Sequence, residues 1–469
     1  MGTMYQGAPD LKVTIQDTSL VFPSEETERK SMFLSNIDQV LNFDVQTVHF
    51  FPAHSDFPPQ IIAEKVKNAL SKVLVSYDFL AGRLKLNPNS DDHVVSAAGA
   101  RLEIECNAAG AGFVVASSEY TLDEIGDLVY PNPAFRQLIV QTLDDDTLLS
   151  QQNGQPLCVL QVTTFKCGGF SMGTSTNHST FDGISFKIFL ENLASQAADK
   201  PLAIPPCHDR HLLAARSPPR VTFPHPELVK VKIPIGQEKE DHQSPPVFVC
   251  SQEDLDFEIF WLSSGDVASL KEKARKDNSA SDRGHHSKAK ITSFNVVTAH
   301  IWRCKALSCD TNDLDRLSTV LYAVDIRSRL SPPLPQSFAG NAVLTAYATA
   351  QCRELEEGPF SRLVEMVSEG AARITDEYAR SAIDWGELYK GFPHGEFLVS
   401  SWWRLGFAQV EYPWGKPRYS CPVVYHRKDI ILLFPGIHDG INNDGVNVLV
   451  ALPAKEMENF KTLFHKFLA

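Results

Sequence analysis

The chain has 469 residues, of which 43% are hydrophobic and 22% are charged. This balance is typical of globular proteins, so disorder over most of the chain is excluded, and the length predicts two or three domains, or two large ones. Lysine and arginine total 44 against 57 acidic residues, which gives a net charge of −13. We therefore expect no non-specific binding to nucleic acid, and an anionic ligand needs a local basic patch.

The sequence shows no pattern for membrane insertion or export. Its densest apolar run, Ile430 to Phe434, has the length of a strand, so we expect no membrane span. The opening MGTMYQGAPDLKV lacks the apolar core of a secretory signal. The nine cysteines form no CxxC pair, so they are interpreted as reduced and mostly buried thiols. A cytoplasmic protein is expected.

The first predicted elements are a strand and a helix. Residues 43–51 (FDVQTVHFF) alternate apolar and polar side chains, which is typical of a strand. Residues 59–75 carry apolar residues at helical spacing, and prolines stand at the start, where a helix tolerates them. The segment LAGRL at 80–84 predicts a tight corner after this helix.

Two short apolar runs follow around the glycine-rich segment AAGAG. Residues 102–106 and 112–116 predict two strands, which we expect to form a hairpin with each other. The glycines of this segment do not form a dinucleotide-binding loop, because the third glycine of that motif is missing and a strand follows in place of a helix.

Strands are predicted next at 157–165 and 169–175, followed by a helix at 181–194. The second of these strands ends just before the HxxxDG sequence at His178 to Gly183. The sequence therefore places this motif at a junction between a strand and a helix.

The second half begins with a change in composition. Residues 201–246 are rich in proline, including three Pro-Pro pairs, and predict a long extended connection between domains. Residues 271–290 are charged and poor in apolar residues, which predicts an exposed, mobile loop. The last predicted element is a helix at 453–467.

The segment His178-Ser179-Thr180-Phe181-Asp182-Gly183 carries the chemistry. A neutral imidazole can take the proton of an alcohol or amine that attacks a carbonyl, and Asp182 can either orient that imidazole or hold the loop through an ion pair. A structural histidine followed by a helix-capping aspartate also fits the motif. A metal site is not expected, because no third ligand cluster is evident, and no GxSxG elbow indicates a serine nucleophile.

Further motifs lie downstream. EYPWG spans Glu411 to Gly415, SSW spans Ser400 to Trp402, and VDIRSR spans Val324 to Arg329. Together with HSTFDG, LAGRL, VTTFKCGG and FNVVTAHIWR, they make the chain resemble, over nearly its whole length, the BAHD family of plant acyl-CoA-dependent acyltransferases. That family carries HxxxDG near the middle and DFGWG near the end.

The resemblance implies an α/β fold of two domains like chloramphenicol acetyltransferase, joined by a long crossover loop, with the active-site channel between them. The domains would be residues 1–200, which carry HxxxDG, and residues 247–469, with the crossover at 201–246. A strand segment near 411–434 is expected to return to the first domain.

The resemblance also implies roles for the residues of the HxxxDG motif. His178 would be the general base in a ternary complex. Asp182 would point away from the reaction and pair with Arg327, and Gly183 would give the backbone room to turn.

The downstream motifs match further positions of the family. Ser400 matches a hydroxyl that binds the oxyanion, and Trp402 would line the acceptor pocket, although a strand hydroxyl and a core aromatic fit these residues equally. Glu411, Trp414 and Gly415 would be structural. Because the chain has EYPWG in place of DFGWG, with a proline at a glycine position, we expect altered local packing there.

The donor implied is an acyl-CoA, a co-substrate rather than a permanent cofactor. Its phosphates would contact Lys288, Lys290, Thr292 and Ser293. A solvated charged loop that binds no ligand explains these residues equally well. The acceptor would be a small alcohol, phenol or amine, and the protein a monomer.

Asn177 in front of His178, the SSW triplet and the opening LSNIDQVLNF resemble the branch that transfers hydroxycinnamoyl groups. Ring closure of ortho-hydroxycinnamoyl thioesters to coumarins is an alternative within the family. A non-catalytic relative that assists very-long-chain lipid metabolism is another. A peptide-synthetase condensation domain is disfavoured, because Asn177 replaces its first histidine and no carrier domain is evident.

Overall fold

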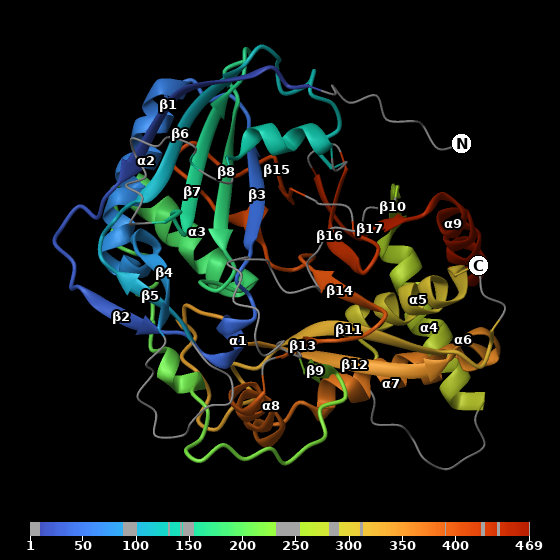
Figure 1. Ribbon diagram of the computed structural model, residues 1–469. Helices are drawn as coiled ribbons and strands as arrows, with labels where there is room; N and C mark the ends of the chain where they lie inside the picture. Colours follow the sequence, from blue (N-terminus) through green and yellow to red (C-terminus); the bar gives the residue numbers. More distant parts are fainter. Residues whose placement is uncertain are drawn as a thin grey trace. The chain divides into compact units, whose positions relative to one another are not determined.

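The computed structural model describes residues 10–87, 101–129, 132–140, 143, 154–230, 254–280, 290–309, 313–389, 391–423, 427–438 and 441–468. The chain divides into two compact units (Figure 1). The first contains residues 1–218, 334–342 and 405–424, and the second contains residues 219–333, 343–404 and 425–469. Each unit is built around a sheet of its own.

The first unit contains a six-stranded sheet in its described part. The strands in spatial order are β1 (Val13–Val21), β6 (Ala111–Ser118), β7 (Cys158–Thr164), β8 (Phe170–Asn177), β3 (Asp44–Phe51) and β15 (Tyr419–Pro422). All neighbours are antiparallel except β6 and β7, which are parallel. Every residue of β8 is buried, so this strand runs through the core. The strands predicted at 43–51, 157–165 and 169–175 are confirmed.

A smaller sheet beside it contains β2 (Lys30–Phe33), β5 (Arg101–Cys106) and β4 (Arg83–Asn87), in this order. The prediction of a hairpin around AAGAG is wrong. Both runs are strands, but β5 pairs with β2 and β4, whereas β6 pairs with β1 and β7. Gly110 between them has a φ of +93°, and the chain turns there from one sheet to the other.

The helices of the first unit place its functional residues. They are α1 (Asn36–Gln39), α2 (Pro59–Ser76) and α3 (Gly183–Ala197), with the 3₁₀ turns η1 (Asp78–Ala81), η2 (Pro133–Leu138), η3 (Arg210–Leu213) and η5 (Phe407–Gln409). The helices predicted at 59–75 and 181–194 are confirmed as α2 and α3, which pack against each other. The stripe predicted for α2 is the buried face of this helix, with Val66, Leu70 and Val73 at 0% exposure.

The second unit also contains a six-stranded sheet in its described part. The strands in order are β10 (Asp256–Leu262), β17 (Ile441–Leu452), β16 (Ile430–His438), β14 (Phe397–Ser401), β11 (Leu317–Asp325) and β12 (Val343–Gln351). The short strand β14 is parallel to both of its neighbours. The apolar run at 430–434 is thus the start of a strand, as predicted.

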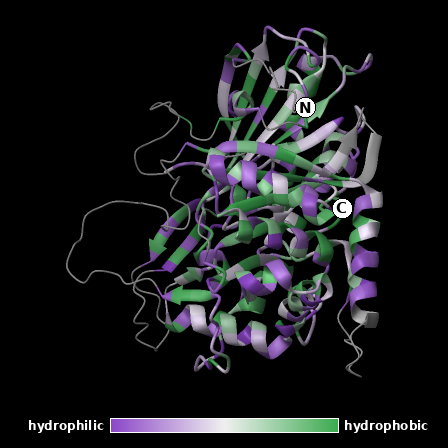
Figure 2. Ribbon diagram, turned by 90° about the vertical axis from the view of Figure 1, so that its right-hand side faces the viewer, coloured by the Kyte–Doolittle hydropathy of each residue, from purple (hydrophilic) through white to green (hydrophobic). Residues whose placement is uncertain are grey.

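The helices of the second unit are α4 (Ser264–Ala280), α5 (Ser293–Ser308), α6 (Cys352–Glu357), α7 (Phe360–Arg373), α8 (Asp376–Leu388) and α9 (Ala454–Leu468). The predicted final helix is confirmed as α9, along which polar and apolar residues alternate in Figure 2. The loop predicted at 271–290 is wrong for residues 271–280, which form the second half of α4. Among residues 271–277 the charged Glu272, Arg275 and Lys276 are exposed, whereas Ala274 is buried at 0% exposure, as on a surface helix with one buried side. Residues 281–289 of the predicted loop lie outside the described residues.

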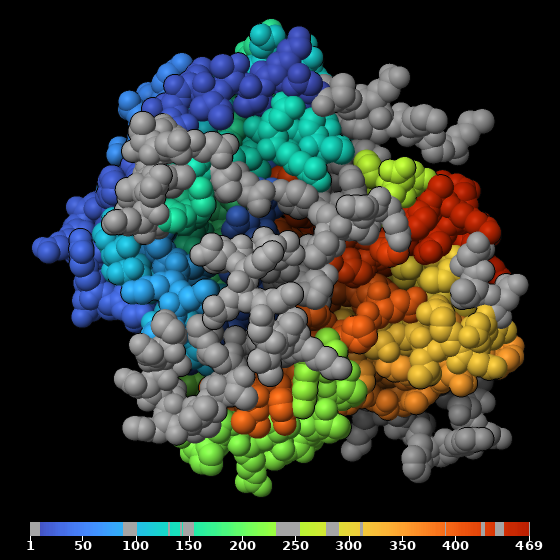
Figure 3. Space-filling model, in the orientation of Figure 1, coloured from blue at the N-terminus to red at the C-terminus, as the bar shows by residue number. Residues whose placement is uncertain are grey.

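The described part of the proline-rich connection, residues 201–230, appears in bright green at the surface in Figure 3. Its last residues form β9 (Leu228–Lys230), which pairs with β13 (Gly391–Pro393) in the second unit. His225 anchors this stretch, because its Nδ1 lies 3.0 Å from Glu227 Oε1 and its Nε2 lies 2.8 Å from Ser381 Oγ on α8. Within the described residues, no helix has the length and hydropathy that a membrane crossing requires.

Candidate active site

His178 directly follows β8 and precedes α3, as the sequence predicted. Its backbone N–H donates to Phe43 O at 2.7 Å, and its carbonyl accepts from Asn341 Nδ2 at 2.8 Å. The rings of Phe43 and His178 lie 5.2 Å apart. The backbone of His178 is therefore held from both sides.

The turn after His178 is closed by side chains. Asn177 Oδ1 accepts from Ser179 N at 3.1 Å and from Ser179 Oγ at 2.6 Å, which is an Asx turn. Thr180 Oγ1 donates to Asn177 O at 2.6 Å. The hydrogen bonds of this buried turn are thus made among Asn177, Ser179 and Thr180. The imidazole of His178 takes no part in them.

The surroundings of the His178 imidazole favour its neutral form, because burial lowers its pKa. Burial lowers its pKa below the usual 6.5, and polar contacts with its own backbone and with Asn341, together with the charges of Asp182 and Asp38, act in the opposite direction. Nδ1 is buried and has no hydrogen-bond partner among the described residues. His178 as a whole is partly exposed, and because Nδ1 is buried, the exposed surface belongs to other atoms of the residue.

Asp182 caps α3 and also holds a distant segment. One carboxylate oxygen accepts from Ser185 N at 2.9 Å, and the other accepts from Ala342 N at 3.0 Å. Both of these bonds accept from backbone N–H groups, so the carboxylate holds the start of α3 and the backbone of residue 342, as the loop-holding interpretation expects. A Cβ at Gly183 would lie 2.6 Å from Leu405 Cδ1, so a larger residue there would require the side chain of Leu405 to shift.

Arg327 belongs to the second unit and lies just beyond β11, where its Nη1 is 3.0 Å from Asp325 Oδ1. Its pairing with Asp182 would join the two units and stays a prediction. Ser400 and Trp402 are also in the second unit, at the end of β14 and just beyond it, and both are half-buried. Ser400 lies opposite Leu432 of β16, and Trp402 N donates to Leu433 O.

Three of the residues predicted to contact CoA lie around the start of α5. Thr292 caps this helix through a 3.1 Å bond from Asn295 N, Ser293 is its first residue, and Lys290 is exposed just before it. A helix start with an exposed lysine beside it is a suitable place for a phosphate. Lys288 lies outside the described residues.

The EYPWG segment forms a tight turn in the first unit. Tyr412 O accepts from Gly415 N at 2.9 Å, so Pro413 occupies the second position of a β-turn, where proline is favoured. Glu411 and Lys416 form an exposed ion pair at 3.7 Å. The proline in place of a glycine is thus compatible with a closed turn.

Trp414 fixes this turn to the sheet. Its side chain is 2% exposed and packs near Phe51 and Phe170, at ring distances of 6.3 and 5.9 Å. Phe51 ends β3, whereas Phe43, beside His178, precedes its start. At about 3.3 Å per residue the turn is about 26 Å along the strand from the histidine, so it has a structural place in the fold.

Three residues next to His178 carried no role in the sequence-based interpretation, namely Asp38, Arg210 and Asn341. The first of them had a local signal, because Ser35-x-x-Asp38 is a capping box, and both of its bonds are present. Arg210 and Asn341 had no such local signal, because they contact Asp38 only in the folded chain.

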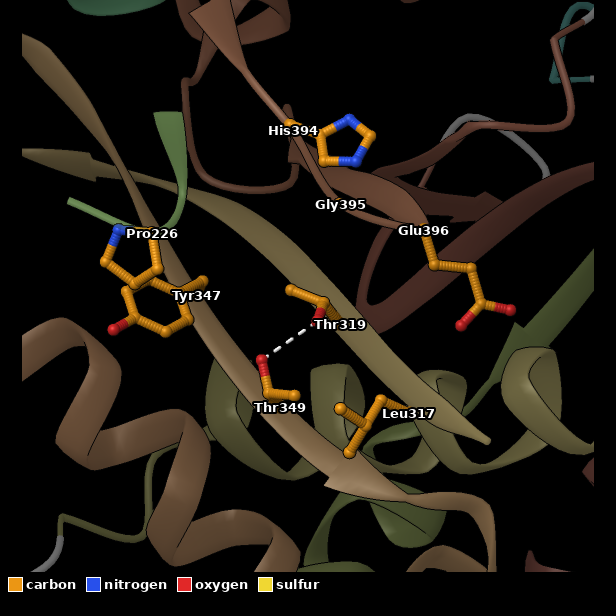
Figure 4. A pocket seen from close by; sticks show the side chains of 8 residues that line it. All are labelled: Pro226, Leu317, Thr319, Tyr347, Thr349, His394, Gly395 and Glu396. Atoms are coloured by element: carbon orange, nitrogen blue, oxygen red, sulfur yellow. Dashed lines mark hydrogen bonds between the residues drawn. The ribbon is translucent and has the colours of Figure 1, made fainter. Parts of the chain in front are cut away.

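A pocket of about 380 Å³ lies in the second unit (Figure 4). The hydroxyls of Thr319 and Thr349 bond to each other at 2.9 Å on its floor, and His394 and Glu396 line one side. Glu396 is already paired with Arg316 at 3.2 Å. The pocket contains none of the predicted site residues. In the described residues we also find no group of three or more His, Cys, Asp or Glu side chains that could hold a metal ion.

Comparison with known proteins gives a consistent result. Residues 11–466 match the model of the Transferase family. The chain is 59% identical to Acyltransferase GLAUCE of Arabidopsis thaliana over 99% of both chains. It is 33% identical to the omega-hydroxypalmitate O-feruloyl transferase of the same plant, over 97% of this chain and 93% of that protein.

The fold matches a solved structure that was determined with a ligand. TRI101 of F. sporotrichioides, complexed with coenzyme A and T-2, superposes with a TM-score of 0.64 at 15% identity, over 92% of this chain and 97% of that one. The predicted mixed α/β fold of two domains is thereby confirmed.

Proposed function

Since this chain belongs to the BAHD acyltransferases, the Transferase family whose model it matches, we propose that it transfers an acyl group from a CoA thioester to a hydroxyl or amine. The observation that carries this proposal is His178, a neutral imidazole with its backbone fixed at the end of a buried strand. The pKa below 6.5 keeps the imidazole able to accept a proton at neutral pH.

In this mechanism His178 takes the proton of the acceptor hydroxyl as the oxygen attacks the thioester carbonyl. The bond from acceptor oxygen to acyl carbon forms, and a tetrahedral oxyanion results. The carbon–sulfur bond then breaks, and the CoA thiolate receives the proton back from the imidazole. Since Nδ1 is buried, Nε2 is the atom assigned to this transfer.

Roles in the reaction are also proposed for residues of the second unit. Ser400 would donate to the oxyanion, a contribution of about 3–4 kcal/mol for one such donor. Trp402 would line the acceptor pocket. Lys290, Thr292 and Ser293 would bind the CoA phosphates at the start of α5, which the coenzyme A in the TRI101 complex supports as a ligand class.

For the substrates, we propose a hydroxycinnamoyl donor and an aliphatic alcohol acceptor, which makes the reaction an O-acylation. The similarity to the omega-hydroxypalmitate O-feruloyl transferase supports both choices, because feruloyl is a hydroxycinnamoyl group and omega-hydroxypalmitate carries a terminal hydroxyl. The expected monomer and cytoplasmic location stay predictions, tested by light scattering and cell fractionation.

The test measures release of free thiol from p-coumaroyl-, caffeoyl-, feruloyl-, malonyl-, acetyl- and long-chain acyl-CoA. Each donor is assayed with and without long-chain ω-hydroxy acids, fatty alcohols, shikimate and an amine pool. Wild type is compared with His178→Ala and with His465→Ala, which removes an exposed histidine of α9.

Release that requires an acceptor, and that falls about 10²–10⁴-fold in His178→Ala but not in His465→Ala, is the expected result. Release without an acceptor would indicate ring closure to coumarins or hydrolysis. No release from any donor, with CoA still bound, would favour a non-catalytic role.

A further inference from the structure

A buried ion pair lies in the first unit, next to the loop that carries His178. Asp38 on α1 and Arg210 on η3 are 0% and 1% exposed, and Asp38 Oδ1 is 2.9 Å from Arg210 Nη1. The other carboxylate oxygen of Asp38 accepts from Ser35 N at 2.9 Å and from Ser35 Oγ at 2.8 Å. Both carboxylate oxygens of Asp38 and both terminal nitrogens of Arg210 are thus bonded, and a displacement of either residue would leave a charge without these partners in the interior.

The pair is connected to the loop by two hydrogen bonds. Arg210 Nη2 donates to Thr180 O at 2.7 Å. Asn341 Nδ2 donates both to Asp38 Oδ1 and to His178 O, each at 2.8 Å. Since both partners of Nδ2 can only accept, the orientation of this amide is determined. Two carbonyls of the HSTFDG loop are therefore held by groups that are themselves bonded to Asp38.

These contacts bring together three segments that are far apart in the sequence. Asp38 belongs to the N-terminal part, Arg210 to the proline-rich connection, and Asn341 to the segment 334–342 that returns to the first unit. The approach is tight, since a Cβ on Gly340 would lie 2.7 Å from Arg210 Cζ. Buried ion pairs contribute little net stability, so the convergence of these bonds on one loop needs a different explanation.

We propose that Asp38 is a positioning residue for the acyl transfer, and that it acts through Arg210 and Asn341 to fix the backbone of the His178 loop. The imidazole is then held in the orientation that proton transfer requires, where a displacement of about 1 Å can cost about 100-fold in rate. This inference rests on the proposed function, in which His178 is the general base.

The charges around the imidazole agree with this placement. Asp182 at the start of α3 and Asp38 on α1 both act to raise the pKa of His178, against the lowering caused by burial. Removal of the negative charge at position 38 is therefore expected to lower the pKa of His178 further, because one of the charges that raise this pKa is lost.

The test compares two variants with a matched control. Asp38→Asn removes the charge, and Asn341→Ala removes the link to His178 O while the ion pair remains, so it reports on the loop even where Asp38→Asn fails to fold. The control is Asp78→Asn, which removes another buried carboxylate of the same unit, paired with Lys30 at 2.9 Å.

With the best acyl-CoA and acceptor, we expect kcat to fall about 10–100-fold in Asp38→Asn and in Asn341→Ala, with KM for the acyl-CoA within about 2-fold. The acid limb of the kcat/KM profile should move to lower pH in Asp38→Asn. Asp78→Asn should keep the wild-type kcat and pH profile. In the His178→Ala background, Asp38→Asn should cause no further loss, because its effect passes through the imidazole.

An equal fall of kcat in all three variants, or a rise of KM without a fall of kcat, would overturn the inference. A wild type that transfers no acyl group would instead contradict the proposed function. The inference is then decided by NMR titration of histidine-labelled protein, with the His178 signal assigned by its loss in His178→Ala. A lower pKa of His178 in Asp38→Asn, but not in Asp78→Asn, supports it, and an unchanged pKa in both overturns it.

Discussion

Asp182→Asn is a stringent test of what the carboxylate in HSTFDG does. In the wild type its two oxygens accept from Ser185 N and Ala342 N. An asparagine keeps one acceptor, which can still cap α3, but its NH₂ group then faces the N–H of Ala342. A buried donor that loses its partner costs about 1–3 kcal/mol, so we expect this loss in the free energy of unfolding.

The corresponding alanine variant should lose more. Asp182→Ala also removes the cap of α3, which adds about 1 kcal/mol, for a total of about 2–4 kcal/mol. At about 2–4 °C per kcal/mol for a unit of this size, Tm should fall by about 4–16 °C. Thr375→Ala provides the control, since Thr375 caps α8 through Tyr378 N alone and its loss should cost only about 1 kcal/mol.

Urea unfolding followed by circular dichroism gives these free energies, and acyl transfer is measured on the same samples. A double-mutant cycle of Asp182→Asn with Arg327→Gln measures the predicted ion pair, for which a coupling above about 1 kcal/mol is expected. Wild-type stability with lost activity in Asp182→Asn would refute the reasoning, because the carboxylate would then act on the imidazole and not on the backbone.

Three further predictions concern the rest of the fold. Burial lowers the pKa of His49 and of His300 to about 3. Below pH 6.5 the unfolded state therefore binds protons that the folded state does not, and the free energy of unfolding should fall by about 1.4 kcal/mol for each histidine and each pH unit. Urea unfolding at pH 7 and pH 5 measures this fall, and equal free energies at the two pH values would contradict the prediction. Trp414→Ala should cost about 3–5 kcal/mol in urea unfolding while the folded fraction keeps its kcat, because the turn lies far from the proposed base. Gly340→Ala should lower both stability, by about 1–3 kcal/mol, and kcat, since its Cβ would meet the guanidinium at 2.7 Å. Gly415→Ala, with no atom within 4 Å of the added Cβ but a φ of +99°, should lower stability alone, and an equal loss of kcat in both variants would count against the positioning network.

The candidate site was partly readable from the sequence. HSTFDG was recognised at a junction between strand and helix, and the structure has β8 and α3 on either side of it. The capping role of Asp182 was open to prediction, because an aspartate before a helix accepts from the N–H groups of its first turn. The bond from Ala342 N was not, since nothing in the local sequence relates these two positions.

The same division applies to the fold. Helices and strands such as α2 and β3 were predicted because their apolar residues repeat with the period of the element itself, which is a local property. The pairing of β5 with β2 and β4 was missed, because two neighbouring runs of strand-like residues do not encode which partner each will bond. The charged half of α4 was predicted as a loop, because few of its residues are apolar and the helical repeat of buried residues is therefore weak in the sequence.

By itself the sequence determined the class of the fold, the family and the histidine on which the proposed chemistry depends. These follow from motifs that are contiguous in the chain and from the family resemblance that the motifs carry. Only the tertiary structure decided that Asp38, Arg210 and Asn341 meet at the His178 loop. Hydrogen bonds and ion pairs between residues 163 to 303 positions apart depend on which strands pair and where the chain returns, and no local pattern records that.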